Sequence, residues 1–156
     1  MHTRRETLSN AAKVAVMLAA AGLLPSFARA QAAATYNSAA FDAKNLADVM
    51  KALGTSAPVE SKDVTVTGPD IAENGAVVPV GAATTLPGVQ RLLLLVEKNP
   101  AMLAAMFDVT DAVDASISTR VKMAQTSDVY AVALTGDGKA LFAKKEIKVT
   151  LGGCGG

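Results

Sequence analysis

The sequence predicts an all-β fold, an antiparallel β-sandwich with an N-terminal helix and a flexible C-terminal arm. Short segments alternate apolar and polar residues, and glycine, proline and asparagine turn signals separate them. The chain is 51% hydrophobic but only 4% aromatic, which suits many small side chains packed in a sheet-rich core. Its 156 residues allow one domain of ordinary size. No apolar run reaches the ~18–20 residues of a membrane-spanning helix.

The first thirty residues have the features of a bacterial export signal. Paired arginines, Arg4 and Arg5, precede an apolar stretch at 11–24, and Ala28-Arg29-Ala30 supplies the small residues of a cleavage site. The arginine pair favours the twin-arginine route, although Thr7 stands where that motif usually carries Phe. The alternative is an amphipathic N-terminal helix of the mature domain. We expect removal of residues 1–30 and localisation in the periplasm.

The chemical groups left after this removal are few. The single histidine, His2, leaves with the signal, so the mature chain contains no Ser-His or Cys-His pair and no imidazole metal ligand. One cysteine, Cys154, excludes an internal disulfide framework and a zinc cluster of thiolates. Fifteen basic residues against fourteen acidic ones argue against a nucleic-acid partner. We therefore expect no catalytic residue, no metal and no cofactor, and a protein that is not an enzyme.

Residues 31–62 form the next segment, predicted to hold one helix and a linker. Ser38 or Asp42 can cap this helix, and Gly54 follows it as a stop signal. Its apolar residues recur at helical spacing, namely Leu46, Val49, Met50 and Leu53. We expect the helix to pack on the edge of the domain; docking of a partner is the alternative. Residues 55–62 are predicted to be the linker.

The sandwich is predicted over residues 63–151, and its first strands are separated by clear turns. Val64 and Val66 alternate with threonines until Gly68-Pro69 ends the strand. Asn74-Gly75 is a hairpin-type turn signal, and the apolar run 76–80 follows it. Pro79 within this run favours a strand at the edge of a sheet, because proline cannot donate a ladder hydrogen bond.

The strongest apolar strand is predicted at 89–97. Its centre, Leu92 to Val96, has no polar residue and indicates burial on both faces. Either the sandwich itself covers both faces, or another subunit covers one of them. The next segment, 102–109, is ambiguous between helix and strand.

Three further elements complete the predicted sandwich. Around 117–123 the apolar side chains lie on one face and Arg120 and Lys122 on the other. A strand at 129–134 is followed by the hairpin turn Gly136-Asp137-Gly138. The final strand, 141–151, alternates apolar residues with Lys148 and Thr150.

The tail carries the one reactive group of the mature chain. Cys154 is surrounded by four glycines, Gly152, Gly153, Gly155 and Gly156, which have little conformational preference. Residues 152–156 are therefore predicted to be a flexible arm that reaches at most about 16–18 Å. The nearest cation in sequence is Lys148, so no local base activates the thiol. This arrangement suits a carried thiol. The alternative is a structural or adhesive sandwich domain that dimerises through an intermolecular disulfide.

The ending from Ile147 to Gly156 resembles the signature of the SoxY family, the sulfur carriers of the bacterial thiosulfate-oxidising Sox system. Three further stretches resemble the same family, namely residues 69–80, 96–100 and 118–122. The resemblance covers most of the mature chain and is most specific in the tail.

The resemblance implies an immunoglobulin-like β-sandwich that pairs with a SoxZ-like subunit as a heterodimer. Cys154 matches the position of covalent substrate attachment. The implied client enzymes are a SoxAX-like c-type cytochrome that joins thiosulfate to the thiol, a SoxB-like manganese hydrolase that releases sulfate, and a SoxCD-like sulfane dehydrogenase. The carrier on its own is expected to hold the sulfur intermediates while these clients act on them.

Overall fold

The computed structural model describes residues 37–150 of the chain. The predicted export signal, residues 1–30, lies outside the described residues, and so does the predicted arm with Cys154 and its four glycines. Within the described range there are two short helices and nine strands. They are α2 (Ser38–Asp42), α3 (Leu46–Ala52), β1 (Val59–Glu60), β2 (Val64–Thr67), β3 (Ile71–Ala72), β4 (Val78–Thr84), β5 (Val89–Val96), β6 (Leu103–Asp108), β7 (Ser116–Val121), β8 (Ser127–Thr135) and β9 (Ala140–Val149).

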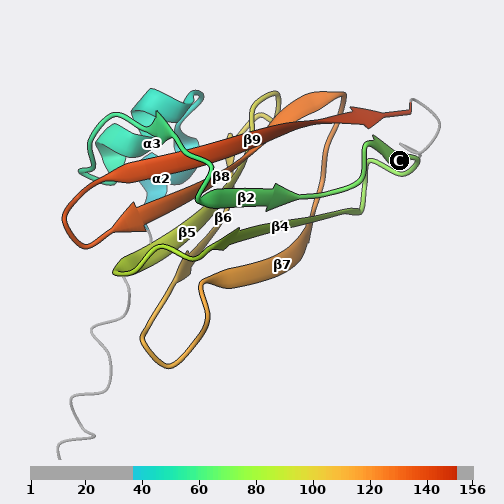
Figure 1. Cartoon of the computed structure of the whole chain (residues 1–156). Coiled ribbons are helices and arrows are strands. Elements are labelled where there is room, and N and C mark those ends of the chain that lie inside the picture. The colour runs from blue at the N-terminus through green and yellow to red at the C-terminus, as the bar shows by residue number, and fades with distance from the viewer. Residues whose placement is uncertain (1–36, 151–156) are drawn as a thin grey trace, which may run out of the picture. The chain divides into compact units, whose positions relative to one another are not determined.

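The strands form two sheets that pack face to face, which confirms the predicted sandwich (Figure 1). The larger sheet has the order β1-β9-β8-β5-β6, with β3 also paired to β9, and the smaller sheet has the order β2-β4-β7. The long strands pair in antiparallel fashion as predicted. The exceptions are the two-residue strands β1 and β3, which run parallel to β9. Strand β1 lies within the predicted linker 55–62.

The predicted N-terminal helix is divided into two, and its predicted caps are wrong. Asn37 caps α2 by accepting a hydrogen bond from the Ala40 amide, and Asn45 caps α3 by accepting one from the Asp48 amide. An asparagine before each helix therefore supplies the capping oxygen that was expected from Ser38 or Asp42. Gly54, with φ of 69°, ends α3 as predicted.

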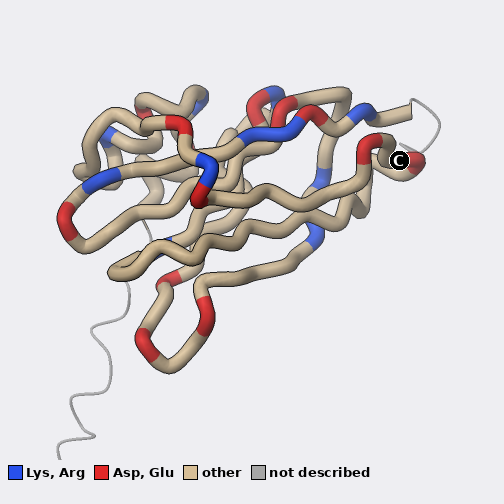
Figure 2. Tube along the Cα trace, viewed as in Figure 1, with Lys and Arg blue, Asp and Glu red and all other residues tan. Residues whose placement is uncertain are grey.

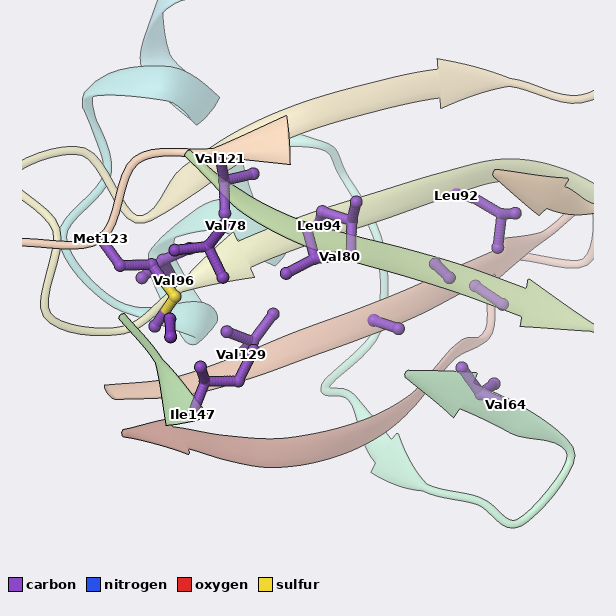
Figure 3. Packing of buried hydrophobic residues seen from close by; sticks show 14 of the residues in the cluster. Val64, Val78, Val80, Leu92, Leu94, Val96, Val121, Met123, Val129 and Ile147 are labelled. Carbon is purple, nitrogen blue, oxygen red and sulfur yellow. The ribbon is translucent and has the colours of Figure 1, made fainter. Parts of the chain in front are cut away.

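The helices cover the outer face of the larger sheet rather than its edge. The side chains of Val49 and Met50 pack with Leu93 and Leu95 of β5, and all four are fully or almost fully buried. On the other face of β5, Leu92, Leu94 and Val96 belong to the core between the two sheets (Figure 3). The prediction that 92–96 is buried on both faces is confirmed. The alternative that another subunit covers one face is wrong, because α2 and α3 cover it.

Strand β6 resolves the ambiguous segment 102–109, and β4 corrects the placement of Pro79. β6 pairs with β5 from Leu103 to Asp108, and this long-range pairing selects the strand.

β4 is the middle strand of the smaller sheet, not an edge strand. Pro79 is tolerated there because β2 pairs only with residues from Gly81 onward, so Pro79 has a strand neighbour on one side alone.

Truncation of either face of β5 is expected to destabilise the domain strongly. We expect Leu94→Ala and Leu93→Ala each to lower the free energy of unfolding by about 2–5 kcal/mol, because both leave a cavity in a sealed core. Leu86→Ala, at a half-buried side chain, is the control and is expected to cost less. Urea unfolding measures all three. A loss below about 1 kcal/mol for Leu93→Ala would show that α2 and α3 do not seal the outer face.

None of the helices within residues 37–150 is long and apolar enough to cross a membrane.

Candidate functional site

The site begins where β9 ends, because β9 is the strand that continues into the cysteine-bearing tail. β3 pairs with the last residues of β9, Ile71 opposite Lys148 and Ala72 opposite Val149. The Thr150 amide donates to the Ala72 carbonyl at 3.1 Å. On the opposite side, the Val149 amide donates to the Thr126 hydroxyl at 3.0 Å. The chain is therefore held up to Thr150 on one side and up to Val149 on the other, and Thr150 lies four positions before Cys154.

A tight turn after β3 packs directly against the end of β9. The Asn74 side chain accepts a hydrogen bond from the Ala76 amide at 2.9 Å, and the Asn74 carbonyl accepts one from the Val77 amide at 3.3 Å. The Met123 amide donates to the Gly75 carbonyl at 2.7 Å. A Cβ atom at Gly75 would lie 2.4 Å from the Met123 carbonyl oxygen and 2.8 Å from Cγ1 of Val149. Glycine is thus required here by close approach.

Two other loops join this turn at the same end of the sandwich. The Asn99 side chain, in the turn between β5 and β6, donates to the Lys122 carbonyl at 2.7 Å. The Lys98 amide donates to the hydroxyl of Ser127 at 3.1 Å, and Ser127 is only 1% exposed. These bonds connect the turn at 97–100 to the loop at 122–126 that leads into β8. We call this end of the sandwich the root face, comprising Ile71, loops 73–77, 97–100 and 122–126, and Thr150.

The root face brings together the stretches on which the family resemblance was based. The stretch 69–80 supplies β3 and the turn at Gly75, and 96–100 supplies the turn at Asn99. The stretch 118–122 ends at Lys122, and the last described residues, 147–150, complete the face. Segments distant in sequence are therefore neighbours around the point from which the tail starts. Sequence reasoning predicted Asn74-Gly75 as a turn but missed its contact with Val149, and it missed Thr126.

The charges near the end of β9 are mixed in sign (Figure 2). Lys145 of β9 contacts the Asp70 carboxylate at 2.8 Å and donates to the Gly68 carbonyl at 2.6 Å. The hydrogen bond from Lys145 to the Asp70 carboxylate, together with the charges of Lys145 and Lys148, lowers the pKa of Asp70 below its usual value. Lys145 therefore binds the segment that precedes β3 through both of these contacts. Lys148 is exposed on the outer face of β9, opposite Ile71.

Two further features of residues 37–150 are the distribution of potential metal ligands and a cleft away from the root face. No group of three or more histidine, cysteine, aspartate or glutamate side chains within residues 37–150 is placed to hold a metal ion. A surface cleft of about 620 Å³ lies at the other end of the sandwich, lined by residues that include Thr65, Leu86, Val109 and Ser116. Cys154, Gly152, Gly153, Gly155 and Gly156 lie outside the described residues, so their positions relative to the root face stay a prediction.

Comparison with known proteins agrees with the resemblance seen in the sequence. Residues 49–154 match the family model described as sulfur oxidation protein SoxY. The structure of the sulfur carrier protein SoxY from Chlorobium limicola f thiosulfatophilum is similar, with 35% sequence identity and a TM-score of 0.59. That match covers 66% of this chain and 93% of the Chlorobium chain. No curated protein matches the chain.

A second structure shares the fold alone. The superoxide reductase (neelaredoxin) from Ignicoccus hospitalis is 15% identical with a TM-score of 0.50. The match covers 56% of this chain and 80% of that one. At this identity the likeness indicates a common sandwich architecture. The family match spans more than half of the chain and includes the strand that bears the tail, so this chain belongs to the SoxY family, the sulfur carriers of the Sox system.

Proposed function

We propose that this protein is a periplasmic sulfur carrier that holds its cargo covalently on Cys154 and presents it to partner enzymes. The observation that carries the proposal is the end of β9. This strand is hydrogen-bonded on both sides up to Val149 and on one side up to Thr150, and the chain continues in sequence into Gly152-Gly153-Cys154-Gly155-Gly156. The only thiol of the chain is thus attached, through a short glycine-rich segment, to a firmly anchored strand.

The proposed cycle changes the sulfur atoms attached to Cys154 and leaves the fold unchanged. The thiol loses its proton, and a c-type cytochrome partner removes an electron pair as a sulfur–sulfur bond to thiosulfate forms, giving Cys–S–S–SO₃⁻. Water then cleaves the bond to the sulfonate group at a manganese hydrolase and releases sulfate. A sulfane dehydrogenase then passes electrons from the remaining persulfide sulfur to its own electron acceptor, while water supplies the oxygens of the resulting sulfonate and releases its protons. A second hydrolysis releases sulfate again and returns the thiol.

The residues of this chain fit the role of holding cargo without reacting with it. After removal of residues 1–30 the chain has no histidine to act as a general base. The hydroxyl of Thr150, the described residue nearest to the tail, donates to the carbonyls of Ala72 and Glu73 at 3.4 and 3.3 Å. The clients and a SoxZ-like subunit complete the machinery, and the export signal directs the carrier to the compartment where they meet.

The test is the intact mass of the protein from cells that consume thiosulfate. We expect thiosulfonate, sulfane or sulfonate adducts on Cys154, and their loss on treatment with a thiol reductant or on enzymatic hydrolysis. Protein from cells grown without thiosulfate is the control. Only free thiol and disulfide-linked dimer, while thiosulfate is being consumed, would contradict the carrier and favour the structural domain that dimerises through Cys154.

A further inference from the structure

We propose that client enzymes dock on the root face, with the exposed apolar side chains of Ile71 and Val77 as their principal contacts. This inference rests on the proposed function. It adds the location and the chemistry of the surface at which a client recognises the carrier.

The length of the tail forces the client against this face. Cys154 is the fourth residue after Thr150, and four extended residue steps span only about 13–14 Å. The reactive group inside a client's narrow cleft can therefore lie no farther from Thr150 than this span plus the length of the cysteine side chain. The rim of such a cleft then meets the residues around Thr150, which are those of the root face.

Ile71 is held outward beside the start of the tail. In β3 the neighbouring Ala72 is 5% exposed and packs into the core, so the alternating strand places Ile71 on the outside, where it is 57% exposed. Its partner on β9 is Lys148, two residues before Thr150. A β-branched side chain on a paired strand loses little conformational freedom when a partner covers it.

Val77 is presented by the turn that packs on Val149. It is 51% exposed, although its backbone is fixed by the hydrogen bond from its amide to Asn74. The turn is anchored through Gly75 to Met123. An apolar side chain on a rigid support is a suitable contact for a partner, because little ordering entropy opposes binding.

The occupant of this surface is a client enzyme whose cleft has an apolar rim. Contact with Ile71 and Val77 buries their methyl groups. The exposed charges around these two side chains are of both signs, Lys122 and Lys148 together with Glu73 and Glu97, so the rim must offer polar groups of both signs opposite them. One such rim is compatible with clients of different chemistry, because the chemistry acts on the cargo at the other end of the tether.

The test compares two root-face variants with matched controls at the other end of the sandwich. Val77→Asp is paired with Val113→Asp, in the loop before β7, and Ile71→Thr with Val59→Thr, opposite Leu141 at the start of β9. The control side chains are 59% and 60% exposed. With purified clients and the assembled carrier, we expect Val77→Asp to raise the KM for the carrier by at least about fivefold with kcat little changed, as for the loss of one interface contact.

The controls are expected to stay within about twofold of the natural chain in KM. Reaction of the Cys154 thiol with a small disulfide reagent should be unchanged in all variants, which separates docking from thiol chemistry. A KM that is unchanged in both root-face variants, or raised equally in the controls, would overturn the proposal. A second result would also overturn the proposal. Sedimentation would show that Val77→Asp weakens association with the partner subunit or with a second copy, while the complex that does assemble keeps its KM.

Failure of this inference and failure of the proposed function give different results. Adducts on Cys154 of the natural chain are measured in the same reactions. Their absence would overturn the carrier function itself. Adducts that form equally fast on the natural chain and on both root-face variants, below saturation, would overturn only the docking surface.

Discussion

Replacement of Cys154 by serine is expected to abolish thiosulfate-dependent turnover completely. The chain has no second thiol that can take over, and a serine oxygen cannot form the sulfur–sulfur bond by which the cargo is held. The loss should be absolute rather than a reduction in rate, because the substrate of every later step never forms. Sulfate release from thiosulfate, measured with the purified partner enzymes, gives the result directly.

The control for Cys154→Ser is the stability of the sandwich. Both hydrophobic clusters lie within residues 37–150, so the urea midpoint of the variant should match that of the natural chain. Sulfate release above about a tenth of the natural rate, from a variant that carries no thiol, would contradict the assignment of Cys154 as the attachment site.

Gly75→Ala is expected to give the largest structural effect of any substitution at the root face. The added Cβ would lie 2.4 Å from a backbone oxygen, that of Met123, which cannot move aside as a flexible side chain can. We expect the free energy of unfolding to fall by about 2–3 kcal/mol, as in an overpacked core. The hydrogen bond from Met123 to Gly75 and the packing on Val149 should weaken together. Hydrogen exchange at the Val149 and Thr150 amides should therefore accelerate more than exchange elsewhere in β9.

Gly81→Ala separates this local effect from general destabilisation. Its Cβ would lie 2.6 Å from the Thr67 hydroxyl oxygen and 2.8 Å from the Ile117 carbonyl oxygen, in the middle of β4. We expect a comparable loss of stability without selective exchange at Val149 and Thr150. Equal exchange profiles in the two variants would contradict the role of Gly75 as a support for the end of β9.

Most strands of the fold could be predicted from local pattern because their residues alternate or are continuously apolar. The run from Leu92 to Val96 and the hairpin turn at Gly136-Asp137-Gly138 are examples. Segment 102–109 could not be assigned, because only its pairing with β5 decides between strand and helix. The sequence also could not show that α2 and α3 cover the second face of β5, because four strands separate these helices from β5 along the chain.

The candidate site also has one part that could be predicted from sequence and one part that could not. The tail could be recognised in sequence because its composition is local, with one cysteine among four glycines. The root face could not, because its contacts join residues far apart in the chain, such as Thr150 with Ala72 and Asn99 with Lys122. Thr126 could not be predicted, because a threonine in a loop is common. Only the structure shows that its hydroxyl accepts a hydrogen bond from the Val149 amide.

The pairing of β9 also determines how the carrier withstands force. Under the proposed function, a client that draws on the tail transmits its pull to β9 through Thr150, and this pull can run along the strand axis. β9 is bonded to β8 from Ala140 to Ile147, to β1 near its start and to β3 at its end. Such a pull loads these hydrogen bonds in shear, so many must break together, whereas a strand peeled from its end loses them one at a time. The same ladder that builds the sheet thus makes the end of β9 mechanically strong against a pull along the strand axis.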